Sequence, residues 1–94
     1  MVAIVFVRSI NYFWERKISQ KLGIDEETLN NLRSEDLKER TIGNGGFWES
    51  DPAETFDEVV LEVEEDDEKE LLTKILEAGK EVLGESEFKY VILN

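Results

Sequence analysis

The 94-residue sequence contains no cysteine, no histidine and only one proline. Without cysteine and histidine the chain cannot form disulfides, use a thiol nucleophile or an imidazole base, or hold zinc through its commonest ligands. Long apolar runs are also missing, because Met1–Val7 stops at Arg8 and a membrane-spanning helix needs about 20 residues. The first residues lack the basic and small-residue features of a signal peptide. We therefore expect a cytoplasmic protein without membrane contacts, cofactors or bound metals.

Basic residues are scarce, since 11 Lys and Arg face 23 Asp and Glu and leave a net charge of −12 at pH 7. The charges of residues 1–48 cancel, so the whole excess lies in residues 49–94. Phosphate backbones and anionic membranes repel such a chain, and direct nucleic-acid binding is not expected. Hydrophobic residues make up 40% of the chain, which supports a packed core in one domain spanning residues 1–94.

The first part of the sequence predicts a strand followed by a helix. Val2–Val7 is apolar throughout and β-branched, which is typical of a central strand buried on both faces. Ser9 is expected to cap a helix over Ile10–Leu22, and Gly23 to end it. The buried face of this helix is expected to contain Ile10, Phe13, Trp14, Ile18 and Leu22.

The middle of the sequence contains weaker signals. A short helix is expected after Asp25, its N-cap residue, and a further turn over residues 34–40. The glycine-rich residues 43–46 interrupt regular structure, and Phe47–Trp48 is expected to form a short edge strand.

The second half predicts a strand, a helix and a final strand. Phe56–Glu65 alternates between an apolar and an acidic side, as in a strand with one buried and one solvated face. Asp66 or Asp67 is expected to cap the next helix and Gly84 to end it, before a strand over Phe88–Leu93.

The resulting fold class is α+β. The order of elements matches the ferredoxin-like (split βαβ) plan, with an extra helical hairpin after the first helix. In that plan the first and third strands are central, and these two segments have the most apolar character here.

Residues 18–32 resemble a helix-turn-helix motif in the spacing of apolar residues around Gly23. In that motif the start of the second helix enters the major groove of DNA. Here the start consists of Asp25, Glu26 and Glu27, whose carboxylates would oppose phosphates. Any helical hairpin needs the same apolar spacing, so the pattern favours a structural hairpin over a DNA-reading one.

Eleven acidic residues and one lysine lie between Asp51 and Glu70, and three interpretations stay open. The stretch can be a solvated face with helix N-cap charges. It can bind a basic partner, since alternate strand residues such as Glu62 and Glu64 lie about 6.6–6.8 Å apart, close to a phosphate repeat. It can also hold a hard cation through Glu62, Glu64 and Asp66.

Two further features bear on function. The first strand carries no acidic residue and ends at Arg8, which removes the central ligand of two-metal phosphoryl-transfer sites. Trp48 follows the glycine-rich residues, and it either packs on the core after a hairpin turn or anchors a partner.

We therefore expect a non-enzymatic acidic domain that binds another, basic protein; an inhibitor or adaptor of a nucleic-acid-handling protein is one form of this function. The residues expected to contact the partner are Trp48, Asp57, Glu58, Glu62, Glu64 and Asp66. Two alternatives remain: a homo-oligomeric structural protein that assembles with itself, and an enzyme that binds Ca²⁺, Mg²⁺ or a small ligand.

Overall fold

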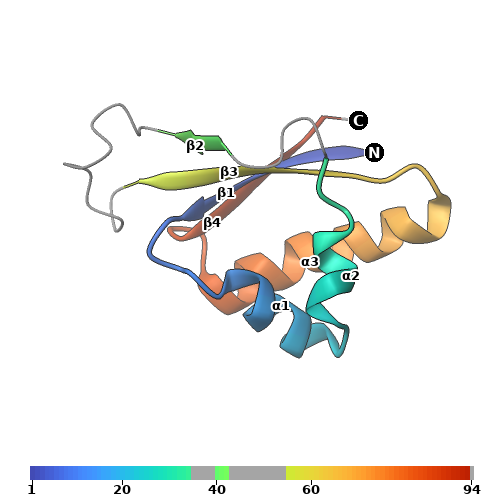
Figure 1. Ribbon diagram of the computed structural model, residues 1–94, viewed down its shortest axis with the longest axis horizontal. Helices are drawn as coiled ribbons and strands as arrows, with labels where there is room; N and C mark the ends of the chain where they lie inside the picture. Colours follow the sequence, from blue (N-terminus) through green and yellow to red (C-terminus); the bar gives the residue numbers. More distant parts are fainter. Residues whose placement is uncertain (35–39, 43–54, 94) are drawn as a thin grey trace.

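A four-stranded sheet and three helices form the described part of the chain, which covers residues 1–34, 40–42 and 55–93 of a computed structural model (Figure 1). The strands are β1 (Val2–Arg8), β2 (Arg40–Ile42), β3 (Phe56–Glu62) and β4 (Phe88–Ile92). The helices are α1 (Trp14–Leu22), α2 (Glu26–Asn30) and α3 (Asp66–Leu83). The predicted α+β class is therefore confirmed.

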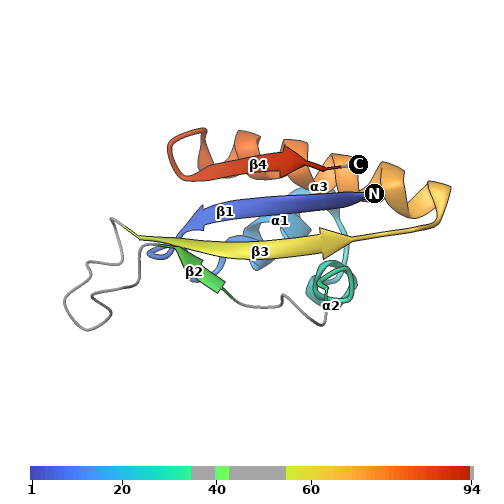
Figure 2. The same ribbon diagram turned by 90° about the horizontal axis from the view of Figure 1, so that it is seen from above.

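The strands follow the order β2-β3-β1-β4, and every neighbouring pair is antiparallel. β1 lies between β3 and β4, so that Ala3 is opposite Leu61 on one side and Ile92 on the other. Figure 2 shows the four strands side by side in this order. The first and third strands are central, as their apolar sequences indicate.

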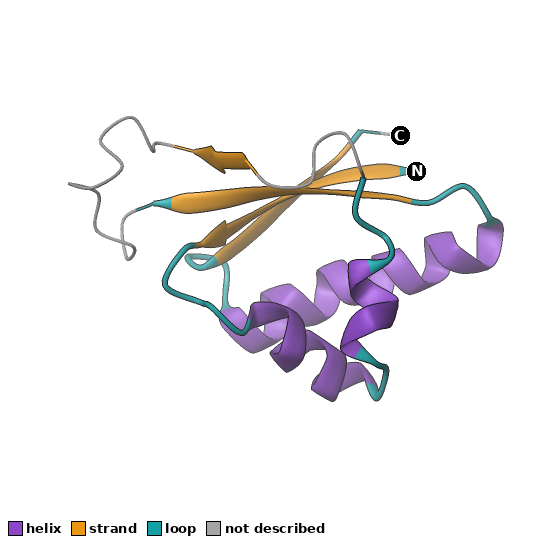
Figure 3. Ribbon diagram, viewed as in Figure 1, coloured by secondary structure: helices purple, strands orange, loops and turns teal. Residues whose placement is uncertain are grey.

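The helices described by the structure all lie against the same face of the sheet, which gives the molecule two layers (Figure 3). The hydrophobic core fills the space between these layers. Its largest fully buried side chains are Phe88, Ile18, Leu29, Leu61, Leu72, Ile75, Leu76, Val5 and Val7. Burial of one such side chain contributes about 1.5–3 kcal/mol, so contacts between the layers are the main source of stability.

Helix α1 begins at Trp14, and Ser9 does not cap it. The Ser9 hydroxyl instead donates a hydrogen bond of 3.0 Å to Oδ1 of Asp57. The backbone N–H of Asn11 donates to the Arg8 carbonyl at 2.9 Å, and the Asn11 side-chain amide donates to the same oxygen at 3.3 Å. These bonds hold residues 9–13 in turns that carry the chain from the sheet to the helix layer.

The predicted buried face of the first helix is wrong at its N-terminal end. Ile10 and Phe13 are 47% and 59% exposed, because they lie in the turns before α1. Trp14 and Ile18, which lie within the helix, are buried in the core. Trp14 is therefore a core residue.

The ends of the other elements differ from the predictions by a few residues. Gly23 and Gly84 end α1 and α3 with positive φ angles of 70° and 91°, as predicted. The N-cap of α3 is Glu65, so Asp66 and Asp67 lie inside its first turn, where their carboxylates interact favourably with the helix dipole. β4 ends at Ile92.

The face of the sheet opposite the helices is not fully solvated, contrary to the prediction. Glu58 and Val60 of β3 are only 8% and 3% exposed, although the sequence places them on the wet side of their strand. Phe6 and Ile4 of β1 lie opposite them in the register and cover that face. These two β1 residues are half-buried, so β1 is fully buried only on its helix-facing side.

The edge strand β2 pairs with the start of β3, where Thr41 is opposite Asp57. The sequence instead indicates a turn over residues 34–40, of which 35–39 lie outside the described residues, whereas Arg40 belongs to β2. Phe47–Trp48, the predicted edge strand, also lies outside the described residues. The described edge strand β2 is thus one that the sequence does not predict, and the edge strand expected at Phe47–Trp48 stays a prediction.

Candidate functional site

Exposed acidic residues follow one another where β3 leads into α3. This connection lies at the right-hand end of Figure 1. We call this group the acidic corner: Glu62, Glu64, Glu65, Asp66 and Asp67. Val63 lies within it but is only 3% exposed, because its side chain belongs to the core. Since alternate residues of an extended chain point to opposite sides, the burial of Val63 turns Glu62 and Glu64 outward.

The backbone of the acidic corner is held by the start of β1. The N–H of Val63 donates to the carbonyl of Met1 at 2.9 Å, and the ammonium group of Met1 donates to the carbonyl of Val63 at 2.7 Å. These two bonds extend the pairing of β3 and β1 beyond the last residue of β3. The carboxylates are therefore presented by an ordered framework.

The acidic corner is poorly neutralised. Its one ion pair among the described residues joins Asp66 Oδ1 to Lys69 Nζ at 3.4 Å, and the fully exposed Asp66 side chain leaves this pair screened by water. Ion pairs elsewhere range from 2.7 to 3.8 Å, so the corner differs from the rest of the described chain in having five carboxylates for one ion pair. The other ion pairs are Arg8–Glu87, Arg16–Glu26, Lys21–Glu81, Arg33–Glu15, Lys74–Glu70 and Lys80–Glu85.

The structure separates the six residues that the sequence suggests for partner contacts. Glu62, Glu64 and Asp66 lie in the acidic corner. Asp57 and Glu58 lie at the other end of β3 and point to opposite faces, because Asp57 pairs with Val7 and Glu58 with Phe6. Asp57 is half-buried and accepts the bond from Ser9, while Glu58 is buried. Trp48 lies outside the described residues.

A cation site at the corner receives no geometric support. Across residues 1–34, 40–42 and 55–93, no three acidic side chains are grouped closely enough to hold a metal ion. The carboxylates of Glu62, Glu64 and Asp66 therefore do not come close enough together to bind one Ca²⁺ or Mg²⁺ ion.

The helix-turn-helix resemblance is explained by packing. Ile18, Leu29 and Leu32, the apolar positions of the pattern, are buried in the core. α2 follows Asp25 as N-cap and contains five residues, with Glu26 and Glu27 exposed in its first turn. The apolar spacing is therefore accounted for by the packing of α1 and α2 on the core.

Sequence reasoning missed an aromatic and basic group on the helix-free face of the sheet. The Arg8 guanidinium lies 5.1 Å, and the Lys89 ammonium 5.8 Å, from the centroid of the Phe56 ring. Arg8 also forms a 2.9 Å ion pair with Glu87. These residues come from three strands that are distant in sequence. Alternation within a strand predicts which face of the sheet each residue lies on, but not which residues of different strands become neighbours.

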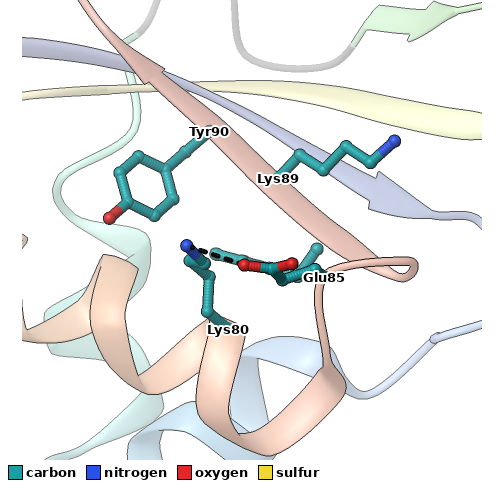
Figure 4. Close-up of a pocket in the computed structure, with 5 residues that line it drawn as sticks. Lys80, Glu85, Lys89 and Tyr90 are labelled. Atoms are coloured by element: carbon teal, nitrogen blue, oxygen red, sulfur yellow. Dashed lines mark ion pairs between the residues drawn. The ribbon is translucent and has the colours of Figure 1, made fainter.

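A second feature missed from the sequence is an open pocket of about 400 Å³ beside β4, which we call the edge pocket (Figure 4). Its lining residues are Lys80, Glu85, Phe88, Lys89 and Tyr90. Lys80 pairs with Glu85 at 3.3 Å, and its ammonium lies 5.8 Å from the Tyr90 ring centroid. The lining combines α3, the α3–β4 turn and β4, a combination that only the folded chain reveals.

Comparison with known proteins adds no assignment. No protein-family model, curated protein or solved structure matches this chain.

None of the helices in the described ranges is long and apolar enough to cross a bilayer.

Proposed function

We propose that this protein is a non-enzymatic interaction domain whose acidic corner binds a basic surface of another protein. The observation that carries the proposal is the exposure of five carboxylates, of which only Asp66 has an ion pair with a described residue, on a backbone held by Met1 and α3. Fixed, unneutralised charge attracts an oppositely charged surface at long range and orients it on approach.

One form of this function is an inhibitor or adaptor of a nucleic-acid-handling protein. The outward carboxylates of Glu62 and Glu64 are expected about 6.6–6.8 Å apart, which is close to the phosphate repeat of a nucleic-acid strand. A protein that binds phosphates through lysine and arginine would meet similar charge spacing here. Trp48 is a second proposed contact.

The strand order supports a ferredoxin-like assignment of the fold. The order β2-β3-β1-β4, with all neighbours antiparallel and helices on one face, is the arrangement expected of a split βαβ sheet with α2 as an added helix. In this arrangement the acidic corner is the connection between the second central strand and the second crossover helix.

The proposal is tested by capture of partners from host lysate at about 100 mM and about 500 mM salt, followed by mass spectrometry. We expect a basic protein that is lost at high salt, and that the double variant Glu62→Lys, Glu64→Lys does not capture. The matched control is Glu27→Lys with Glu77→Lys, which makes the same charge change at two exposed carboxylates outside the corner.

Equal loss of the partner in both double variants would show that only net charge matters and would contradict a binding role for the corner. Recovery of no basic protein at either salt concentration would contradict the proposed function itself. Competition by duplex DNA for the captured protein decides whether the partner handles nucleic acids.

A further inference from the structure

β4 is an edge strand with an unusually apolar exposed end. Val91, Ile92 and Leu93 are 50%, 48% and 58% exposed and follow one another directly. The sheet order ends at β4, so one side of the strand faces no other strand of the described sheet. Exposed edges of this kind readily pair with a second strand unless proline, a bulge or charge blocks them.

The hydrogen-bond register shows which backbone groups this edge presents. Leu93 N–H donates to the Val2 carbonyl at 2.8 Å, and Arg8 N–H donates to the Glu87 carbonyl at 2.9 Å. Because bonding alternates along an antiparallel strand, the groups of Lys89 and Val91 also face β1, whereas those of Tyr90 and Ile92 face outward.

The outward N–H of Phe88 is already used, because it donates to the Gly84 carbonyl at 2.9 Å. Within the described residues, the part of the edge with unused backbone groups therefore begins at Tyr90. This limits the registers in which another strand can pair with β4.

The charge distribution favours a second copy of this chain as the partner that pairs with β4. The chain carries a net charge of −12, yet residues 88–94 contain one lysine and no acidic residue. Lys80 and Lys89 line the edge pocket beside the strand. Two copies that repel each other over most of their surfaces thus meet the least repulsion at β4.

We propose that two copies pair through antiparallel β4 strands, with the two-fold axis at Val91, to form one sheet continuous across both copies. In this register Tyr90 of each copy lies opposite Ile92 of the other, and both residues direct their free backbone groups at each other. The register with Tyr90 opposite Tyr90 is disfavoured, since it would require the Phe88 N–H.

The edge pocket has room for a side chain of the second copy. Tyr90 lines the pocket on the helix-facing side, where about 400 Å³ is open beside its ring (Figure 4). Ile92 of the second copy, opposite Tyr90, places its side chain at that space. On the helix-free face, Val91 lies opposite Val91 of the second copy, and Lys89 lies opposite Leu93 of the second copy.

The proposed dimer does not depend on the acidic corner. Introduced cysteines can test the register of the paired β4 strands, because the chain contains no native cysteine. At the two-fold axis Val91 forms a non-hydrogen-bonded pair with Cα atoms about 4.5 Å apart, within disulfide range. We expect Val91→Cys to form an intermolecular disulfide roughly tenfold faster than Lys89→Cys. Position 89 lies opposite Leu93 of the other copy, so the two cysteines at position 89 are too far apart to bond.

Sedimentation velocity over a concentration series tests the pairing in the unmodified chain, where we expect mass to rise from monomer to dimer. Ile92→Lys should abolish that rise, whereas Ile10→Lys should not, although Ile10 is equally exposed at 47% and the charge change is the same. Ile92→Pro is a second, uncharged variant, which removes the outward N–H of residue 92 and should also abolish the rise.

Circular dichroism confirms that each variant is folded. A monomer at every concentration, or equal loss of dimer in the Ile10 and Ile92 variants, would overturn the proposal. Faster oxidation of the Lys89→Cys variant would overturn the register.

Discussion

At the scale of single residues, the closest fit in the core is between Gly79 of α3 and Phe88 of β4. A Cβ at position 79 would overlap the Phe88 ring, so only glycine lets the helix approach the strand this closely. The Phe88 ring is fully buried, and its centroid lies 6.2 Å from that of Trp14 and 6.4 Å from that of Tyr90. One glycine therefore sets the spacing of α3 and β4.

We expect Gly79→Ala to lower the free energy of unfolding by about 1–2 kcal/mol. At so close a contact the overpacking cost should lie in the upper part of the usual range of about 1–3 kcal/mol, which outweighs the gain of about 1 kcal/mol that alanine brings to a helix interior. Urea unfolding measures the effect. Glu77→Ala, an exposed change on the same helix, should stay within about 0.5 kcal/mol of the unmodified protein.

The same contact predicts coupling between the two positions. Phe88→Leu alone should destabilise the protein by leaving space in the core, but combined with Gly79→Ala it should cost less than the sum of the single changes. Additive losses, or an unfolding midpoint unchanged by Gly79→Ala, would contradict the close fit.

At the scale of elements, an ion pair ties α1 to the chain that follows α2. Glu15 Oε1 lies 2.7 Å from Arg33 Nη2, and these side chains are only 20% and 10% exposed. The Arg33 guanidinium also lies 5.8 Å from the Trp14 ring centroid. The pair is shielded from water, so loss of one member leaves the other poorly solvated.

Glu15→Gln is expected to lower the free energy of unfolding by about 1–3 kcal/mol. The control is Glu26→Gln, since the Glu26–Arg16 pair is longer, at 3.7 Å, and about half exposed, which should make its loss cost less than about 0.5 kcal/mol. Similar urea midpoints for the two variants would show that the buried pair adds no net stability.

The elements predicted well from the sequence are those with strong local signals. The apolar run of β1, the alternation of β3 and the glycine after α3 each mark their element without help from the rest of the chain. β2 is different, because its three residues carry no periodicity and form a strand only through pairing with β3. Ile10 and Phe13 have helical spacing but lie in turns fixed by bonds from Asn11.

The candidate site could be predicted in part for the same reason. Exposure of Glu62 and Glu64 follows from strand alternation around Val63. The burial of Glu58 does not, because Glu58 lies between two neighbouring strands, paired with Phe6 of β1 and with Arg40 of β2. The edge pocket likewise needs neighbours from α3 and β4, so no local pattern indicates it.

At the scale of the whole molecule, net charge opposes folding. The molecule is 41 Å long, whereas the Debye length is about 30 Å at 0.01 M salt and about 3 Å at 1 M. At low salt most of the excess carboxylates therefore repel one another across the folded chain. Added salt should therefore stabilise the folded chain, because it weakens this repulsion more than it weakens the attraction within the few shielded ion pairs.

We expect the urea midpoint to rise between about 20 mM and about 500 mM NaCl. The double variant Glu62→Gln, Glu64→Gln should be more stable than the unmodified protein at low salt and should gain less from added salt. A midpoint that falls with salt would mean that attractive pairs outweigh the excess charge.

The central position of β1 has a consequence for synthesis. Its partners, β3 and β4, follow only after residue 55, and residue 3 pairs with residue 92. A chain made from its N-terminus therefore exposes this apolar strand without neighbours while most of the protein is still being translated. The sheet closes late, and we expect β1 to be the segment where misassembly on the ribosome begins.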